Sequence, residues 1–393
     1  MSLGFHNTAF PKVNTRDTRS SFYDAFGSYY SPNNVTTSSV AGFESGVSAS
    51  YSAFTETHGG TCTAAISSTG KLAVCYESST TLSIYNGIGG GENTVNLPGG
   101  ADNWRGMVYN PDSNYFVVTA DRAVAVEADT AATSSITLPY GSSQTWGSVQ
   151  YEGDHYIAPI FGSTTQIGRL SMTTGGFNTS TLIGSSFTST TNFGSPAMSR
   201  DGVLVWAGEG NGDVKEYDIV NDTFSTISGG IQYAGYQGWA PLPNGKLFSP
   251  GWNSSNYMLY TPASLNGGTS KIDVIAKGFS TTSFGPWSNV FTGLDGNAWY
   301  SSSKGVSQIG GIYTDLYCYN WRENIFFKTQ YKLPANSTGG DRQNQAIVCM
   351  PDGRLFIAPN NGASVYYTVK IFDTNNTTDM NSRVNGLLPD TGN

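Results

Sequence analysis

The amino-acid sequence predicts an all-β protein built from seven copies of a four-strand unit. Three observations lead to this prediction. A tight turn recurs between two apolar runs, a further strand-like run follows each turn, and the 393 residues hold no long window of helical periodicity. Most of these turns are of the Asp-Gly or Asn-Gly type, which suits a hairpin because glycine reaches positive φ without steric cost.

The recurring turn is clearest in four segments of similar pattern. These are AIVCMPDGRLFIAP (346–359), APLPNGKLFSPG (240–251), PAMSRDGVLVWAG (196–208) and FTGLDGNAWYSS (291–302). Looser copies are SVQYEGDHYIAPI (148–160), AAISSTGKLAVCY (64–76) and GMVYNPDSNYFVV (106–118). The turns recur at intervals of roughly 40 to 57 residues, which is the range expected of propeller blades.

A third strand follows each turn after roughly 15 to 21 residues, and six of the seven copies add a weaker fourth strand. Four strands in each of seven units predict a single seven-bladed β-propeller. The blades are expected near 61–97, 105–138, 146–183, 195–228, 237–276, 288–333 and 344–388.

The seventh copy has no convincing fourth strand. Closing the ring removes the exposed edges between the first and last blades, so another segment should complete this blade. The favoured candidate is ESGVSASYSAF (44–54), which alternates and precedes the first blade, and the alternative is SRVNGLL (382–388). The predicted propeller domain therefore spans residues 44–393.

Residues 1–43 carry no blade pattern and are predicted to form a separate N-terminal arm. The arm has basic residues near its start (Lys12, Arg16 and Arg19) and more aromatic residues than a solvated segment usually carries. We expect it to be extended and to dock its aromatic side chains on a neighbouring subunit. The alternative is a solvated tail. The aromatic residues are Phe5, Phe10, Phe22, Tyr23, Phe26, Tyr29 and Tyr30.

Composition excludes several classes of function. The net charge of −8 argues against nucleic-acid binding, which needs a basic surface. The sequence contains no run of 18 apolar residues, so no transmembrane helix is predicted. The N-terminal residues lack the apolar core of a standard secretory signal.

The sequence offers little material for catalysis or for a metal site. One histidine lies in the arm and the others in different blades, so neither a metal site nor a Ser-His-Asp triad is expected, and no cofactor is expected. The histidines are His6, His58 and His155. The four cysteines lack zinc-type spacing. Cys62 and Cys75 would face each other if the first hairpin turn held four residues; otherwise all four are small buried strand residues.

Four tryptophans mark the starts of innermost strands, about 6 to 9 residues before their turns. They are Trp104, Trp146, Trp239 and Trp287. One interpretation is that they wedge between adjacent blades. The other is that they line the mouth of the central channel and stack on a sugar or peptide, which makes them candidate ligand-binding residues.

Most acidic residues fall at turns, where bonding to the backbone explains them. Asp102 and Asp341 are the two that lie near the starts of innermost strands, so a glycoside hydrolase would have to use this pair. Because nothing else supports such a site, we predict that the protein is not an enzyme.

The segments WAPLPNGKLFSPGWNSSNYMLYTP (239–262) and VCMPDGRLFIAPNNGASVYYTVKIFD (348–373) resemble kelch-like propeller repeats. Similar repeats occur in structural proteins of tailed bacteriophages, and the resemblance covers about residues 55–375. It implies a virion component, assembled in the host cytoplasm, whose propeller sits on a tail or capsid. Its partners would be other virion proteins, reached through the arm, and host-surface glycan. The alternatives are a glycan-binding or adhesion propeller outside a virus, or a carbohydrate-active enzyme.

Overall fold

The computed structural model describes residues 35–36, 39–40 and 49–52 and most of the chain from 62 to 370. Within the last range it leaves out residues 87–91, 103, 105, 140–144, 160–165, 185–195, 208–211, 231–237, 252–254, 278–289, 294–295, 302–305, 309–310, 335–343, 350–353 and 360–364.

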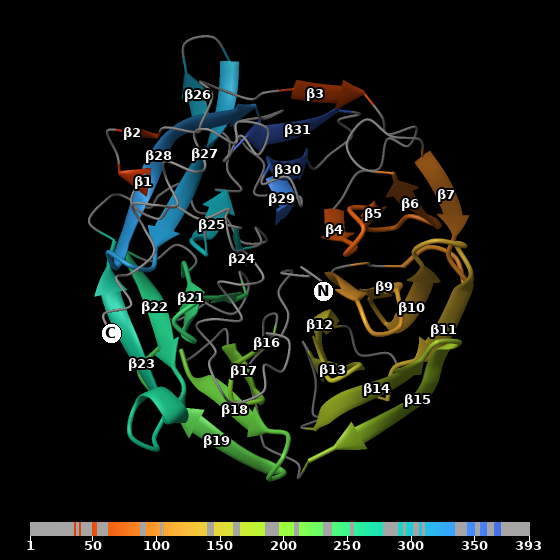
Figure 1. Ribbon diagram of the computed structural model, residues 1–393, viewed down its shortest axis with the longest axis horizontal. Coiled ribbons are helices and arrows are strands. Elements are labelled where there is room, and N and C mark those ends of the chain that lie inside the picture. Colours follow the sequence, from red (N-terminus) through yellow and green to blue (C-terminus); the bar gives the residue numbers. More distant parts are fainter. Residues whose placement is uncertain are drawn as a thin grey trace, which may run out of the picture.

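The described chain forms six four-stranded sheets and one five-stranded sheet, all antiparallel, set around a central axis (Figure 1). No α-helix occurs among the described residues; one 3-10 turn, η4, spans Ala263–Leu265. The predicted all-β class is confirmed. A separate two-stranded ladder joins β1 (Val35–Thr36) to β2 (Ser39–Val40).

We number the sheets along the chain. Sheet 1 contains β4 (Cys62–Ile66), β5 (Leu72–Tyr76), β6 (Thr81–Tyr85) and β7 (Glu92–Asn96). Sheet 2 contains β8 (Gly106–Asn110), β9 (Tyr115–Thr119), β10 (Arg122–Glu127) and β11 (Thr133–Thr137). Sheet 3 contains β12 (Thr145–Tyr151), β13 (Asp154–Pro159), β14 (Ile167–Thr173) and β15 (Gly176–Ile183). Sheet 4 contains β16 (Ala197–Met198), β17 (Val203–Ala207), β18 (Val214–Asp218) and β19 (Thr223–Ile227).

Sheet 5 follows the same plan, whereas sheet 6 has a fifth strand and sheet 7 takes one strand from earlier in the chain. Sheet 5 contains β20 (Ala240–Pro241), β21 (Leu247–Ser249), β22 (Asn256–Thr261) and β23 (Lys271–Ala276). Sheet 6 contains β24 (Val290–Thr292), β25 (Ala298–Ser301), β26 (Val306–Gln308), β27 (Gly311–Asn320) and β28 (Ile325–Pro334). Sheet 7 contains β29 (Asn344–Cys349), β30 (Arg354–Pro359), β31 (Val365–Lys370) and β3 (Ala49–Ser52).

Each sheet falls on one predicted repeat unit, with its first strand nearest the axis in Figure 1. Sheet 7 takes its fourth strand from the other end of the chain, because β3 pairs with β31 in a register that joins Ala49 to Thr368. This strand lies within segment 44–54, the favoured candidate for closure. The alternative segment, 382–388, lies outside the described residues, and the domain boundaries stay a prediction.

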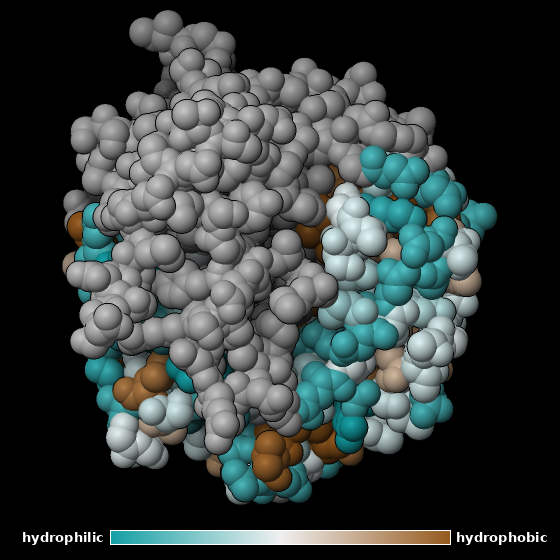
Figure 2. Space-filling view, viewed as in Figure 1, coloured by the Kyte–Doolittle hydropathy of each residue, from teal (hydrophilic) through white to brown (hydrophobic). Residues whose placement is uncertain are grey.

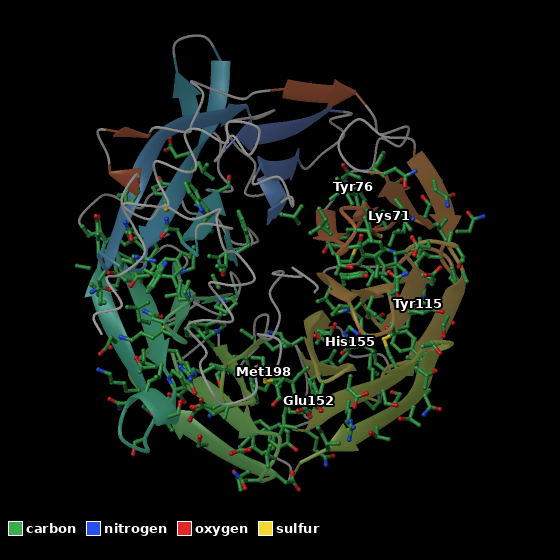
Figure 3. All side chains as sticks on the ribbon, viewed as in Figure 1. Lys71, Tyr76, Tyr115, Glu152, His155 and Met198 are labelled. Carbon is green, nitrogen blue, oxygen red and sulfur yellow. The ribbon has the colours of Figure 1, made fainter. Side chains whose placement is uncertain are left out.

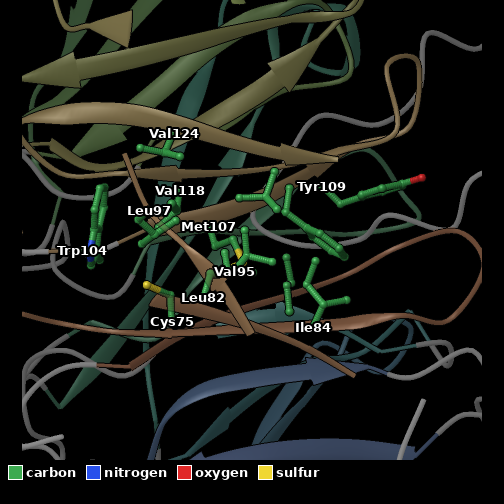
Figure 4. Close-up of a cluster of buried hydrophobic side chains, with 14 of the residues drawn as sticks. Cys75, Leu82, Ile84, Val95, Leu97, Trp104, Met107, Tyr109, Val118 and Val124 are labelled. Atoms are coloured by element: carbon green, nitrogen blue, oxygen red, sulfur yellow. The ribbon is translucent and has the colours of Figure 1, made fainter. Parts of the chain in front are cut away.

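The core consists of apolar layers between neighbouring sheets. Inner strands are buried along their whole length, as in β5 (LAVCY) and β9 (YFVVT), because a propeller sheet is covered on both faces. Figure 4 shows the layer between sheets 1 and 2, where Leu82 and Ile84 of β6 contribute to the same cluster as Val118 and Val124 of sheet 2. The outermost strands, such as β11 and β19, alternate between exposed and half-buried residues.

The predicted turn glycines adopt the conformation that required them. Gly70, Gly153, Gly202, Gly245 and Gly296 all have positive φ, between 65° and 85°. The copy without glycine, at residues 106–118, places an asparagine in the left-handed region instead, with φ of 63° at Asn114. Gly353, in the seventh copy, lies outside the described residues.

A turn motif that the sequence analysis missed recurs in three sheets. A tyrosine hydroxyl donates to the side-chain oxygen of an Asn or Asp five residues later, and that residue has positive φ. The residue after each tyrosine is also Asn or Asp, and its side chain accepts from the two backbone N–H groups that cap the turn. The pairs are Tyr109–Asn114, Tyr217–Asp222 and Tyr319–Asn324.

The first hairpin corrects the expectation that Cys62 could face Cys75. The connection between β4 and β5 holds five residues, so Cys62 lies opposite Tyr76 and Cys75 lies opposite Thr63. The extra residue shifts the register by one, and neighbouring residues of a strand point to opposite faces. The pairing therefore gives no basis for a disulfide between them.

Candidate functional site

Trp104 and Trp239, the two predicted ligand-binding tryptophans whose side chains the structure describes, pack between sheets. Trp104 is fully buried in the layer between sheets 1 and 2, and its indole N–H donates to the Ser79 carbonyl at 2.9 Å (Figure 4). Trp239 is equally buried between sheets 4 and 5. Neither offers a ring face to a ligand, which is the first of the two interpretations. The side chain of Trp146 and all of Trp287 lie outside the described residues.

Asp102, one half of the predicted carboxylate pair, is held in an ion pair. Its Oδ2 lies 2.9 Å from Nη1 of Arg122, and only 8% of its side chain is exposed. The same guanidinium donates to the carbonyls of Pro98 and Gly100 and lies 5.0 Å from the Trp104 ring. This carboxylate therefore anchors an arginine between two sheets. Asp341, the other half of the pair, lies outside the described residues.

His155 of β13 is completely buried, and burial strongly lowers its pKa (Figure 3). Asn110 Nδ2 lies 3.0 Å from its Nε2, and Ser148 Oγ lies 3.3 Å from its Nδ1. Asn110 Oδ1 accepts from the backbone N–H of Asp112 and Ser113, which fixes the amide with its NH2 toward the ring. An amide NH2 can only donate, so Nε2 accepts and Nδ1 carries the proton.

This hydrogen-bond pattern makes His155 a structural residue. Complete burial lowers its pKa to about 3, so the ring is neutral at ordinary pH. Its Nδ1 donates toward Ser148 and does not accept the hydroxyl proton, so the pair does not form an activated nucleophile. Among the described residues, no cluster of three or more His, Cys, Asp or Glu side chains could hold a metal ion. His6 and His58 lie outside them.

A cleft of about 550 Å³ opens between sheets 4 and 5, and the sequence analysis did not find it. Its walls come from β17, β18 and β19 on one side and from β22 and the segment that joins it to β23 on the other. The lining residues are Val203, Glu216, Asp218, Thr223, Ser225, Thr226, Ile227, Ser228, Tyr260, Ala263, Gly268, Thr269 and Ser270. The available signal was the hydroxyl-rich outer strand TFSTIS (223–228), which carries no motif.

Glu216 joins the two walls of this cleft. It is 7% exposed, and its two carboxylate oxygens accept from hydroxyls on opposite walls. Tyr260 donates to Oε1 at 2.6 Å, and Ser225 donates to Oε2 at 2.5 Å. Burial, and then the bond to Glu216, raise the pKa of Tyr260 far above its ordinary value, so its hydroxyl keeps its proton.

The second carboxylate of the cleft has a local partner. Asp218 Oδ1 accepts from the backbone N–H groups of Val220 and Asn221, both at 2.9 Å, and so caps the turn between β18 and β19. No Lys, Arg or His lines the cleft. The nearby Lys215 lies opposite Thr226 in the ladder and bonds to its hydroxyl at 2.9 Å. The walls therefore combine negative charge with many hydroxyl oxygens.

One buried lysine was also missed. Lys277 is 4% exposed, its Nζ donates to the Gly251 carbonyl at 3.0 Å, and the Phe326 ring lies 5.9 Å away. Burial lowers its pKa to about 7. A neutral lysine can act as a nucleophile, but one this buried is closed to a substrate in the present conformation.

Comparison with known proteins identifies the architecture. Solved structures match most of the chain at low identity. A streptogramin B lyase shares 12% identity over 80% of this chain and 95% of its own, with a TM-score of 0.61. The β-propeller domain of Cps50 (Swd1) from Myceliophteria thermophila shares 10% over 82% and 98%, with a TM-score of 0.58. The chain is a β-propeller.

At identities this low, the similarity to these structures shows the fold alone. A catalytically inactive variant of virginiamycin B lyase from Staphylococcus aureus, with a histidine replaced by alanine and solved with quinupristin, matches this propeller at 13% identity. It covers 81% of this chain and 97% of its own, with a TM-score of 0.61. No family model and no curated protein matches the sequence. No helix among the described residues is long and apolar enough to cross a membrane.

Proposed function

We propose that this protein is a non-catalytic structural propeller of a bacteriophage virion, part of the tail or associated with the capsid. Its role is to hold other virion proteins, through its N-terminal arm and its propeller surfaces, and to contact the host surface. Propellers suit such a role because their rigid rings carry binding surfaces that differ from one protein to the next.

The observation that carries this proposal is the state of the polar groups between the sheets. His155 and Asp102 are the groups in the sequence with the strongest catalytic potential. His155 is fully buried, the Asp102 side chain is 8% exposed, and each is held by a fixed partner from another strand or sheet. The cleft between sheets 4 and 5 is accessible. Its walls present hydroxyls and carboxylates but no base or nucleophile of altered pKa. Such walls favour binding over reaction.

The lyase comparison bears on this choice. That lyase has a catalytically inactive variant in which a histidine is replaced by alanine. The described part of this chain contains one histidine, His155. Because this ring is buried and its Nδ1 carries the proton, it is unsuitable as a base. The virion part of the proposal rests on the resemblance of the repeats to those of phage structural proteins.

Quantitative mass spectrometry of purified particles tests the proposal. The particles should come from the phage whose genome encodes this chain, and the lysate supernatant serves as the matched control. We expect the chain in the particles at a constant ratio to the major capsid protein, with immunogold label on the tail or capsid. Recovery of the chain only in the supernatant, or cleavage of a glycan by the recombinant protein, would contradict the proposal.

A further inference from the structure

We infer that the cleft between sheets 4 and 5 is a docking site for the basic segment at residues 11–20 of this same protein. The inference rests on the proposed function, in which the N-terminal arm makes the assembly contacts, and it names the surface that receives the arm.

The walls carry two carboxylates, Glu216 and Asp218, and no Lys, Arg or His side chain. Tyr260 and Ser225 both donate their hydroxyl protons to Glu216. A carboxylate can accept about four hydrogen bonds, so Glu216 keeps capacity for two more. A ligand with positive charge and N–H donors would complement this wall. A guanidinium fits both needs because it carries five N–H donors and no acceptor.

The shape suits a long cationic side chain on an extended backbone. Val203, Ile227 and Ala263 give the cleft apolar surface for a methylene stem, while the carboxylate lies deeper. Among the described strands, β19 is the outermost of sheet 4 and pairs with β18; a strand in this position can receive an added strand. The volume of about 550 Å³ exceeds what one side chain needs and leaves room for flanking residues.

On the part of the face that Figure 2 colours, hydrophilic residues predominate and hydrophobic residues form only small groups. The exposed large hydrophobic residues come from different elements: Leu182, Val220, Leu265, Val274 and Ile325.

The segment supplies what the cleft lacks. PKVNTRDTRS (11–20) holds three basic residues, Lys12, Arg16 and Arg19, and one acidic residue. Its proline and β-branched residues favour an extended backbone. In Figure 1 the β1–β2 ladder lies on the side of the ring that carries sheets 5 and 6. The 14 residues between segment 11–20 and β1 can span at most roughly 50 Å when fully extended.

Site-specific photo-crosslinking in the full-length chain tests the contact. A benzophenone amino acid replaces Thr269, an exposed residue that lines the cleft, and in a matched control it replaces Thr94, an exposed residue of β7 on sheet 1. We expect the Thr269 probe to capture peptides from residues 11–20 and the Thr94 probe to give none. Arg16→Glu with Arg19→Glu should lower the yield by about fivefold or more. Capture of other segments, or an unchanged yield in the double variant, would overturn the inference.

Isotope mixing separates this inference from the proposed function. Equal amounts of ¹⁵N-labelled and unlabelled chains are combined before irradiation. Crosslinks that join a labelled to an unlabelled peptide support both the cleft and the role of the arm between copies. Crosslinks that join only peptides of the same isotopic mass support the docking site. They would show that the arm binds its own chain and does not contact a neighbouring copy. Absence of any arm crosslink refutes the docking site and leaves the particle test of the proposed function intact.

Discussion

Tyr260 of sheet 5 donates its phenolic proton to Glu216 of sheet 4 at 2.6 Å, and neither residue is more than 7% exposed. The bond crosses the interface between two sheets that otherwise meet through apolar layers such as the one around Trp239. Because a buried carboxylate must be compensated, this bond fixes how the two sheets meet along the cleft.

Tyr260→Phe should destabilise the propeller by about 1–3 kcal/mol, since Glu216 would lose a donor in a buried setting. The matched control is Tyr217→Phe, which removes a bond of 2.8 Å to the exposed Asp222 within a turn. We expect about 0.5–1.5 kcal/mol there, because water can replace the lost donor. Urea denaturation measures both free energies of unfolding. Equal losses would show that the bond between sheets has no special weight.

Gly245→Ala should cost more than Gly267→Ala, although both glycines have positive φ. A Cβ at Gly245 would lie 2.4 Å from Arg200 Cδ and 3.0 Å from Leu265 Cδ1, whereas a Cβ at Gly267 meets nothing within 4 Å. Both variants carry the left-handed penalty of about 1–2 kcal/mol, so their difference isolates the steric clash. Thermal unfolding measures it, and equal midpoints would contradict the close packing of the Gly245 turn against Arg200 and Leu265.

Stability should fall with pH below 6.5 because of His155. Its pKa is about 3 in the folded protein and near 6.5 when unfolded, so the unfolded chain binds the extra proton between these values. The contribution is complete above pH 6.5 and is lost as the pH falls toward 3. Between pH 6.5 and 4.5, wild type should lose more stability in urea than His155→Gln, by at most about 1.4 kcal/mol per pH unit. Parallel pH profiles would contradict the buried neutral ring.

Lys277 should make the stability of the protein depend on pH in the alkaline range. Its pKa of about 7 in the folded protein lies below the ordinary 10.5, so the unfolded chain again binds the extra proton between these values. Stability should therefore rise as the pH rises from 7.5 to 9.5 in wild type, and stay flatter in Lys277→Met. Urea midpoints at the two pH values measure this. An equal rise in both proteins would show that Lys277 is charged in the fold.

The sequence predicted the repeat, the turns and the all-β class because these follow from local patterning. Alternation and glycine placement act over a few residues, and Gly70 and Gly245 show it directly. Register was harder: one additional turn residue moved Cys62 opposite Tyr76.

The cleft could not be predicted from the sequence because its parts are far apart in the chain. Glu216 and Tyr260 are separated by 44 residues, and neither belongs to a recognisable motif. The tryptophans carried a sequence signal, but at Trp104 and Trp239 that signal reports packing between sheets. Only tertiary structure distinguishes a buried aromatic ring from one that faces a ligand.

A cryo-EM reconstruction of the purified particle would show whether this propeller is part of the virion. We predict a ring of β-sheets with the connectivity described here, attached to the tail or capsid, with density for residues before β3 that reaches a neighbouring protein. A reconstruction that accounts for every protein of the particle and contains no such propeller would contradict the account.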